Sequence, residues 1–455
     1  MTRLLQFHKD FRVISGWLAL AGPMLRWLTP ARRRTILIAG ALGIALKSPL
    51  KKMTKSHVWS EVPPDVISVI VVTIIIFAFL WFCYRVALKF ASMPSFIRRN
   101  PQMCLHAIFW GMLVIIWNTS PEAGIWRIVM VGIAINLPFF IWRLGYMLIS
   151  AKHDKVAGTR FWDHLMYLAP VYGGSNTPYG KGLDYLSRHE AKDEESLARS
   201  QLAGIRLLIL AGLWQGVLFI MDGLVFGVDN LVNHVLGGFA LEVPRLSQLI
   251  KQPEIASIGM GWLSLYCELI RDVLDLAVRG HQIIGILRLS GFYVFRNTYK
   301  PLLAETVIEF WNRYYYYFKE ILVNFFFFPT FASWFRKNFT LRLFTAVFMA
   351  AFFGNMYYHL FKLSDQLIQA DFNAIWLTLH ARLFYCFLLS LGLFISMLRE
   401  HRRGRKPRPR RGMMQRGLSI FGVWTFFAVI NVWNQKGGIP FFKGTKFFLQ
   451  LIGIT

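Results

Sequence analysis

The chain has 455 residues, of which 55% are hydrophobic and 16% charged, and its mean hydropathy is +0.43. This composition is too apolar for an ordinary water-soluble protein, so the sequence predicts a protein embedded in a bilayer. The net charge of +27 does not indicate nucleic-acid binding, because many basic residues fall between apolar runs, as in 47–55 and 399–416, and no recognition motif accompanies them. We expect these stretches to be cytoplasmic loops beside anionic lipid headgroups.

Apolar runs in residues 1–150 predict N-terminal transmembrane helices. The clearest run, 66–84, carries no charge and is long enough to cross most of a bilayer. Basic residues follow it, so the positive-inside rule places that end in the cytoplasm. Runs 104–117 and 126–149 then cross outward and back, and the turn at 121–122 between them should be external.

Residues 151–455 are expected to form the core of one integrated membrane domain with the N-terminal helices. The polar stretch 151–200 has mixed charge and predicts a cytoplasmic loop with amphipathic or re-entrant pieces. Run 205–221 crosses outward again.

The region 261–295 interleaves apolar residues with a density of charge that a lipid-exposed helix does not tolerate. Five of its charges are spaced three or four residues apart and therefore lie close to one helical face. They could line a polar mouth, but mutual ion pairing within the bundle is the favoured interpretation. These charges are Glu268, Arg271, Asp272, Asp275 and Arg279.

Three later runs, 341–361, 374–398 and 418–432, complete an all-α, polytopic arrangement of roughly nine to eleven transmembrane helices. The basic loop 399–416 should be cytoplasmic, which sends 374–398 inward and 341–361 outward. His359 is then expected in the external half of the membrane.

An ordered set of motifs occurs between residues 161 and 432. The stretches FWDHLMYLAPVYGG (161–174) and GIRLLILAGLWQGVLFIMD (204–222) come first, and the segment GHQIIGILRLSGFYVFRNTYKPLLAETVIEFWNRYYYY (280–317) follows. FFGNMYYHLF (352–361) contains His359, and WLTLHARLFY (376–385) contains His380.

This ordered set resembles the membrane-bound O-acyltransferase (MBOAT) family. The members that it resembles are the bacterial proteins that act in alginate acetylation and teichoic-acid D-alanylation. The segment 280–317 is similar to the family's R-L-x-G-F, N-x-x-x-P-Y-L and F-W-x-R-W-H elements, and His359 stands where the family carries its W-H-G histidine. Two contexts differ, since Tyr314 and Tyr315 replace the W-H pair and Leu360 replaces the glycine. The resemblance implies an MBOAT-like helical bundle with re-entrant segments around a central tunnel.

His359 is the candidate catalytic residue. Acyl transfer from a thioester to a hydroxyl needs a base that accepts the hydroxyl proton, and a neutral imidazole suits this role at neutral pH. The alternative interpretation is that His359 hydrogen-bonds within a helix bundle or anchors a helix end, as isolated intramembrane histidines often do. The order of the motifs favours catalysis.

Other residues in the matched motifs are expected to bind substrate or line the same cavity. A tyrosine hydroxyl could orient a substrate or donate to a developing oxyanion. The alternative for the tyrosines is an aromatic belt at the membrane interface, and Arg313 and Lys319 could instead pair with headgroup phosphates. The predicted set is Asn297, Asn312, Arg313, Tyr314, Tyr315 and, more weakly, His380.

The sequence contains no H-E-x-x-H or C-x-x-C motif and no compact carboxylate cluster, so we expect no metal site and no bound cofactor. The resemblance implies an acyl thioester, acyl-CoA or an acyl carrier protein, as co-substrate and an exported glycan as acceptor. It also implies a multi-pass protein of the bacterial cytoplasmic membrane that works with an extracytoplasmic acyltransferase or a synthase.

Two other functions are alternatives to the acyltransferase. A catalytically silent MBOAT-like subunit, acting as a scaffold or conduit in a polysaccharide or lipid export complex, is favoured by the altered tyrosine and leucine contexts. A secondary transporter would show repeated halves with paired interrupted helices, and the sequence lacks them.

Overall fold

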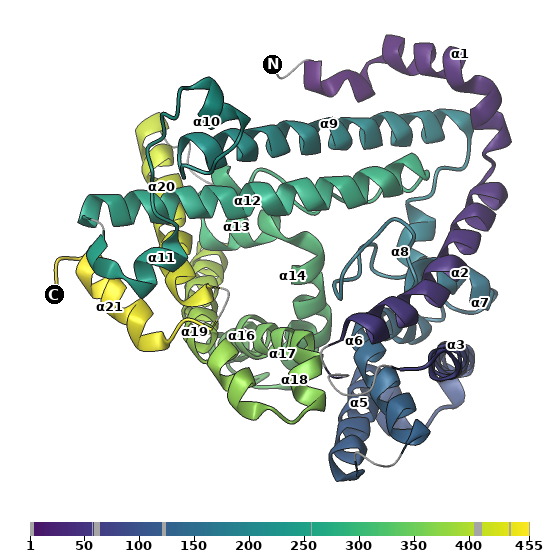
Figure 1. The fold of residues 1–455 in the computed structure, drawn as a ribbon. Coiled ribbons are helices and arrows are strands. Elements are labelled where there is room, and N and C mark those ends of the chain that lie inside the picture. Colours follow the sequence, from purple (N-terminus) through teal and green to yellow (C-terminus); the bar gives the residue numbers. More distant parts are fainter. Residues whose placement is uncertain are drawn as a thin grey trace. The chain divides into compact units, whose positions relative to one another are not determined.

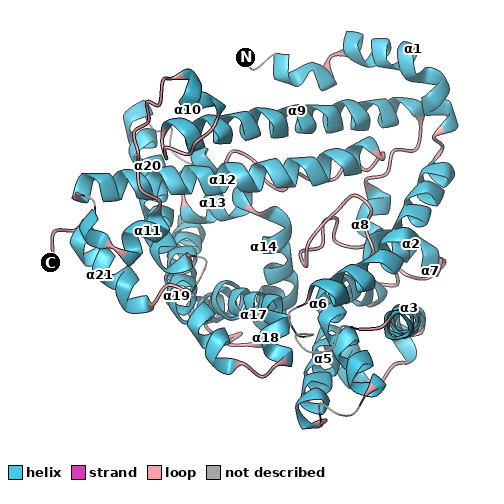
Figure 2. Ribbon diagram, in the orientation of Figure 1, coloured by secondary structure: helices cyan, strands magenta, loops and turns pink. Residues whose placement is uncertain are grey.

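The computed structural model describes residues 4–56, 58, 64–120, 124–255, 257–404, 412–435 and 438–454. The secondary structure of these residues is helical (Figure 2), apart from one isolated antiparallel bridge between Glu190 and Phe292. The sequence-based prediction of an all-α fold is therefore confirmed for the described part of the chain.

Contacts within the chain group it into two compact units. Unit 1 comprises Met1–Leu207, Ile283–Phe295 and Phe361–Phe372, and unit 2 comprises Leu208–Gln282, Arg296–Leu360 and Asn373–Thr455. Each unit is assembled from three separate stretches of sequence. The predicted boundary between the N-terminal helices and the core, at residue 150, is not a boundary between these units.

Unit 1 contains the N-terminal helices and the first part of α9 (Figure 1). Within it, α9 and the end of α12 lie against each other, because a Cβ at Gly204 would come within 2.7 Å of the Gly285 carbonyl oxygen. Its helices are η1 (Leu4–Lys9), α1 (Phe11–Trp27), α2 (Pro30–Lys55), α3 (Val66–Leu88), η3 (Phe90–Ser92), α4 (Ser95–Arg99), α5 (Pro101–Asn118), α6 (Ile125–Ala151), α7 (Phe161–Leu168), α8 (Leu183–Arg188) and α9 (Glu194–Leu224).

Unit 2 contains most of the later helices, including the one that carries His359. Two of its segments, η6 and η7, are π-helical turns set within longer helices. The helices η8 (Phe361–Leu363) and α18 (Ser364–Ile368) belong to unit 1. The helices of unit 2 are α10 (Leu231–Val235), α11 (Leu246–Lys251), η4 (Pro253–Ile255), α12 (Ile258–Leu289), η5 (Pro301–Leu303), α13 (Val307–Tyr314), α14 (Tyr316–Leu322), η6 (Val323–Phe327), α15 (Phe328–Ser333), α16 (Phe339–Phe348), η7 (Met349–Gly354), α17 (Asn355–Leu360), α19 (Phe372–Arg403), α20 (Met413–Ile430), η9 (Asn431–Asn434) and α21 (Phe441–Leu451).

Seven helices among the described residues are long and apolar enough to cross a membrane. They coincide with the seven runs for which the sequence gives bounds, since a run of apolar residues must satisfy its backbone hydrogen bonds internally in lipid. The protein is thus a multi-pass helical membrane protein, and the larger count of nine to eleven stays a prediction. The seven are Val66–Leu88, Pro101–Asn118, Ile125–Ala151, Glu194–Leu224, Phe339–Ile368, Phe372–Arg403 and Met413–Asn434.

The predicted loops are shorter than the sequence suggests. Residues 47–55 are the end of helix α2, and the predicted basic loop 399–416 is helical at both ends, up to Arg403 and from Met413. The polar stretch 151–200 holds α7, α8 and the start of α9. The prediction of extended loops was wrong at these ends because lysine and arginine are good helix formers. The predicted external turn at 121–122 lies outside the described residues.

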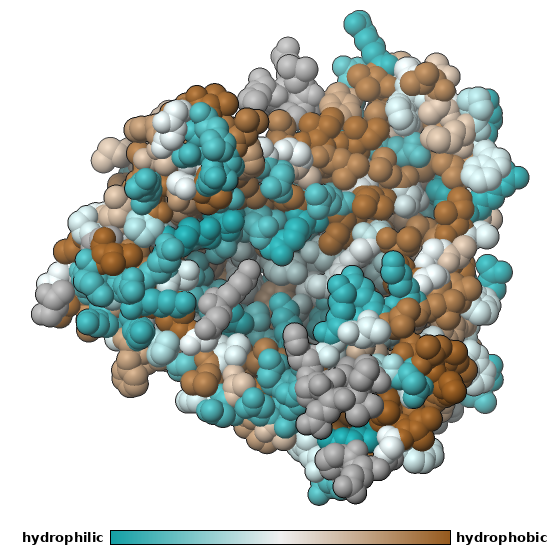
Figure 3. Space-filling model, in the orientation of Figure 1, coloured by the Kyte–Doolittle hydropathy of each residue, from teal (hydrophilic) through white to brown (hydrophobic). Residues whose placement is uncertain are grey.

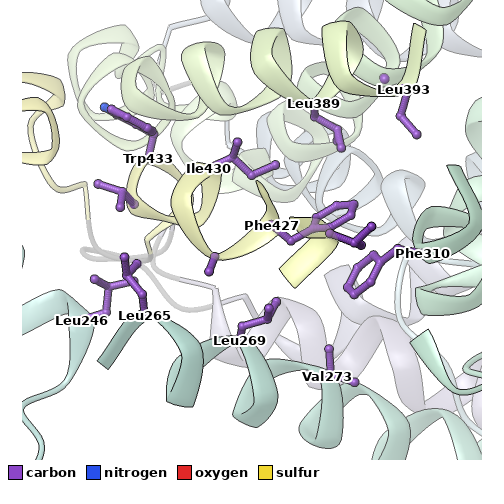
Figure 4. Packing of buried hydrophobic residues seen from close by; sticks show 14 of the residues in the cluster. Leu246, Leu265, Leu269, Val273, Phe310, Leu389, Leu393, Phe427, Ile430 and Trp433 are labelled. Atoms are coloured by element: carbon purple, nitrogen blue, oxygen red, sulfur yellow. The ribbon is translucent and has the colours of Figure 1, made fainter. Parts of the chain in front are cut away.

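A hydrophobic core holds unit 2 together (Figure 4). Phe310 of α13 stacks on Phe427 of α20 with ring centroids 3.9 Å apart, and Leu269 of α12 and Leu389 of α19 belong to the same buried cluster. In a bilayer, such a core is stabilised by van der Waals packing between the helices rather than by the transfer of side chains out of water. This core fixes the position of α12, α13, α19 and α20, the helices that carry the polar residues described below.

Apolar residues are also open on the surface, as the brown regions of Figure 3 show. In α3, Ile70, Ile74 and Phe82 are each more than half exposed. Such an apolar exterior is expected where lipid rather than water surrounds a helix.

Candidate functional site

His359 lies in α17, directly after the π-helical turn η7. A second π turn, η6, contacts η7, and Gly354 permits this approach, because a Cβ there would lie 2.6 Å from Cδ2 of Phe326. A π turn inserts an extra residue and shifts the direction of the side chains that follow it. The orientation of the half-buried His359 therefore depends on this pair of irregular turns.

His359 hydrogen-bonds Arg382 of α19. Its Nδ1 atom lies 2.7 Å from Nη1 of Arg382. A guanidinium has only donors, so Nδ1 of His359 is the acceptor in this bond. The neutral imidazole then carries its proton on Nε2.

Arg382 begins a chain of polar contacts that ends at a carboxylate. Its Nε donates to Oδ1 of Asn434 at 3.0 Å. Nδ2 of Asn434 donates to Oδ1 of Asn431 at 3.4 Å, and Nδ2 of Asn431 donates to Oδ2 of Asp272 at 3.2 Å. Each amide accepts on one side and donates on the other, so the chain has one consistent direction from the guanidinium to the carboxylate.

The phenol of Tyr314 is influenced by the same carboxylate. Burial raises the pKa of Tyr314 well above its ordinary value, and the negative charge of Asp272 raises it further. The hydroxyl therefore stays protonated at neutral pH and is available as a hydrogen-bond donor. Tyr314 was predicted as a site residue, and the structure connects it electrostatically to the polar chain that begins at His359.

Tyr315 lies at the break between α13 and α14. Its ring contacts Phe318 with centroids 5.4 Å apart, and the ring of Phe318 lies 6.5 Å from that of His359. The two predicted residues thus share one aromatic neighbour. Tyr358, which precedes the histidine, is almost fully buried against the same phenylalanine at 4.7 Å.

Asn297 holds the α13–α14 break in place. Its side-chain oxygen accepts from the backbone N–H of Tyr317 at 3.3 Å, and its carbonyl accepts from that of Tyr316 at 2.9 Å. These bonds satisfy N–H groups at the start of α14 that have no partner within the helix. Asn297 is 1% exposed, so the structure gives this predicted site residue a supporting position under the tyrosines.

Arg313 and Asn312 point to different surroundings. Arg313 forms an ion pair with Glu309, four residues earlier on α13. Asn312 is exposed and lines a cavity of about 520 Å³ together with Trp311 and Lys319. His359 is not among the residues that line this cavity. Asn312 and His359 therefore do not share this cavity.

His380 uses both ring nitrogens to join two helices. Nε2 accepts from the backbone N–H of Phe441 at 3.0 Å, which requires Nδ1 to carry the proton and donate to the carbonyl of Trp376 at 2.9 Å. The bond to Phe441 satisfies the first N–H of α21. This arrangement connects α19 to α21 and gives His380 a structural role.

The charges of α12 pair mostly with other elements. Glu268 pairs with Arg245, and Arg271 pairs with Asp222 at 2.9 Å. Asp275 and Arg279 pair with each other along the helix, as the spacing predicts. The predicted pairing of these charges with one another is therefore confirmed for Asp275 and Arg279 only. It was wrong for Glu268 and Arg271, because their partners lie on other elements that are distant in the sequence.

Sequence reasoning missed Arg382, Asn434 and Asp272 as members of the site. A signal was present for the first, since an arginine inside the apolar run 374–398 is a functional candidate by default. Nothing in the local sequence of the other two indicates that they lie in the same polar chain.

No protein-family model matches the chain, and no curated protein sequence matches it.

Proposed function

We propose that this chain is a membrane O-acyltransferase with His359 as its catalytic base. The observation that supports this most directly is the ordered set of motifs in residues 161–432, in which His359 stands where the resembled family carries its histidine. The hydrogen bond from Arg382 adds that the proton of the neutral imidazole is on Nε2, so Nδ1 is the nitrogen that would accept a hydroxyl proton.

The proposed reaction moves an acyl group from a thioester to a hydroxyl. The hydroxyl oxygen attacks the carbonyl carbon, a C–O bond forms, and the C–S bond breaks. The hydroxyl proton passes to Nδ1 of His359 and from there to the leaving thiolate. The hydroxyl must first take the place of the Arg382 guanidinium, because that guanidinium occupies the Nδ1 lone pair in this structure.

The substrates follow from the resemblance. We propose a small acyl group such as acetyl, an acyl-CoA or acyl carrier protein as donor, and an exported polysaccharide or glycoconjugate as acceptor. The location proposed is a bacterial cytoplasmic membrane, with an extracytoplasmic acyltransferase or a synthase as partner.

The experiment compares ester content of the exported glycan in a deletion strain complemented with the native chain, His359→Ala or His153→Ala. His153 is exposed and lies in unit 1, so its variant controls for loss of an imidazole. We expect His359→Ala to lower the ester content by about 100-fold or more at equal protein abundance, which is the usual contribution of a general base. Native ester content with His359→Ala would show that the histidine is not the base.

A catalytically silent subunit is the second candidate function, and one observation favours it. The bond to Arg382 occupies the nitrogen that a base would use, so the histidine could act only as part of a structural network. In that case the exported glycan of the deletion strain loses its ester, and complementation with the His359→Ala variant restores the ester content in full. If the deletion strain keeps its ester content, the chain has no part in acylation.

A further inference from the structure

Unit 1 contains a cavity of about 650 Å³ that none of the residues of the His359 site lines. We call it the basic cavity. It is formed by the end of η1, the end of α8 and the residues that follow it, the start of α9, and Tyr293. Its volume is within the range of cavities that hold a small organic ligand, and is much larger than a single phosphate ion requires.

Basic side chains outnumber acidic ones in the lining of the basic cavity. Lys9, Arg188 and Arg199 are basic, and Glu190 is the one carboxylate in the lining. That carboxylate is already bound by the guanidinium of Arg34, which is not part of the lining. The charge presented to a ligand is therefore positive.

Two of the cations have acidic partners, but these ion pairs are exposed. Arg188 lies 2.8 Å from Asp184, and its side chain is 61% exposed. Arg199 pairs with Glu195, and both side chains are about half exposed. Ion pairs of this kind contribute little, at most about 1 kcal/mol, so a phosphate group can compete for both guanidinium groups.

The frame around these cations is well connected. The backbone of His189 accepts from Tyr293 at 2.8 Å, and the N–H of Ala191 donates to Gly291 at 2.8 Å. Trp17 of α1 donates to Gln201 of α9 at 3.0 Å. These bonds hold the residues after α8, helix α1 and the start of α9 in place before any ligand binds, which lowers the entropy cost of binding.

We propose that the basic cavity binds a phosphate ester, either the headgroup of an anionic lipid or a soluble phosphorylated compound. The two sources share the same chemistry, a phosphate held by arginine and lysine with organic bulk that fills the remaining volume. The proposal does not depend on the acyltransferase function, because none of the residues that carry it belongs to the His359 site.

The test uses the full chain in nanodiscs. In phosphatidylcholine nanodiscs, calorimetric titration with adenosine 3′,5′-bisphosphate measures binding of a soluble phosphate ester. In nanodiscs that also contain phosphatidylglycerol, native mass spectrometry counts the anionic lipids retained by the protein. Two variants are compared with the native protein: a double variant that combines Arg188→Gln and Arg199→Gln, and the single variant Lys9→Gln. Arg98→Gln is the control, because Arg98 is exposed in α4 and outside the cavity.

In at least one arm we expect the double variant to weaken binding by about tenfold or more. Lys9→Gln should weaken it less, and Arg98→Gln should leave it within about twofold of the native value. Weakening in the titration identifies a soluble ligand, and loss of retained lipid identifies a headgroup. If the double variant does not fold, the comparison of Lys9→Gln with the native protein decides whether the cavity binds the ligand. Lys9 is exposed, so its replacement should not disturb folding. Equal behaviour of native and variant proteins in both arms overturns the proposal.

Discussion

Replacement of Arg382 by methionine tests the polar chain that begins at His359. Methionine has a similar length but no donor, so Nδ1 of His359 and Oδ1 of Asn434 both lose the bonds measured at 2.7 and 3.0 Å. Hydrogen bonds between membrane helices contribute about 0.6 kcal/mol on average and up to about 1.7 kcal/mol. Two bonds to a charged donor are at the upper end of this range. The expected loss in the free energy of unfolding is therefore about 1–3 kcal/mol.

The assay is reversible unfolding of the purified protein in mixed micelles, with Arg98→Met as the control for loss of an exposed arginine. A double-mutant cycle with His359→Ala isolates the interaction between the two side chains. We expect a coupling energy of about 0.5–2 kcal/mol, the range for residues in direct contact. Nitrogen NMR of a histidine-labelled sample reports the ring directly. It should show the proton of His359 on Nε2 in the native protein.

The reasoning is refuted if Arg382→Met changes stability by no more than the control and the two substitutions are additive. It is also refuted if the proton of His359 resides on Nδ1, because the guanidinium could not then donate to that atom.

Two further predictions concern packing and charge. Gly354→Ala should destabilise the protein by about 1–3 kcal/mol, because the added Cβ would lie 2.6 Å from the ring of Phe326; Gly422→Ala, where nothing lies within 4 Å, should be neutral or stabilising in the same unfolding assay. Burial lowers the pKa of Lys52 from 10.5 to about 7, so the folded state disfavours its proton. Lys52→Met should therefore stabilise the protein most below about pH 7, and the gain should fade as the pH rises from 7 towards 10.5. Unfolding measured at pH 6.5 and 9.5 checks this trend, and an equal gain at both values contradicts it.

Much of the fold could be read from the residues themselves. The run 66–84 predicts helix α3, and 374–398 predicts most of α19, because an apolar segment in lipid can satisfy its backbone only by forming a helix. The same reasoning does not locate helix ends. Residues 47–55 and 399–403 are helical although they are strongly basic, since charge determines the surroundings of a segment more than its backbone conformation.

The candidate site was predictable only in part. His359, Tyr314 and Tyr315 come from the motifs, and the structure places Tyr315 and His359 against the same phenylalanine. Asn312 lines a cavity that His359 does not line, and His380 bonds the backbone of another helix. A one-dimensional pattern gives the order of such residues but not the direction of their side chains.

By itself, the sequence determined that this chain is a multi-pass helical membrane protein, because length and apolarity are local properties that decide whether a segment can cross lipid. Only the tertiary structure decided that His359 meets Arg382, that the guanidinium leads through two amides to Asp272, and that Lys9 and Arg199 line one cavity. These relations depend on how α12, α19 and η9 pack, and on how η1 packs with α9. Hydrogen bonds and charge interactions act over a few ångströms in space between residues that are distant along the chain.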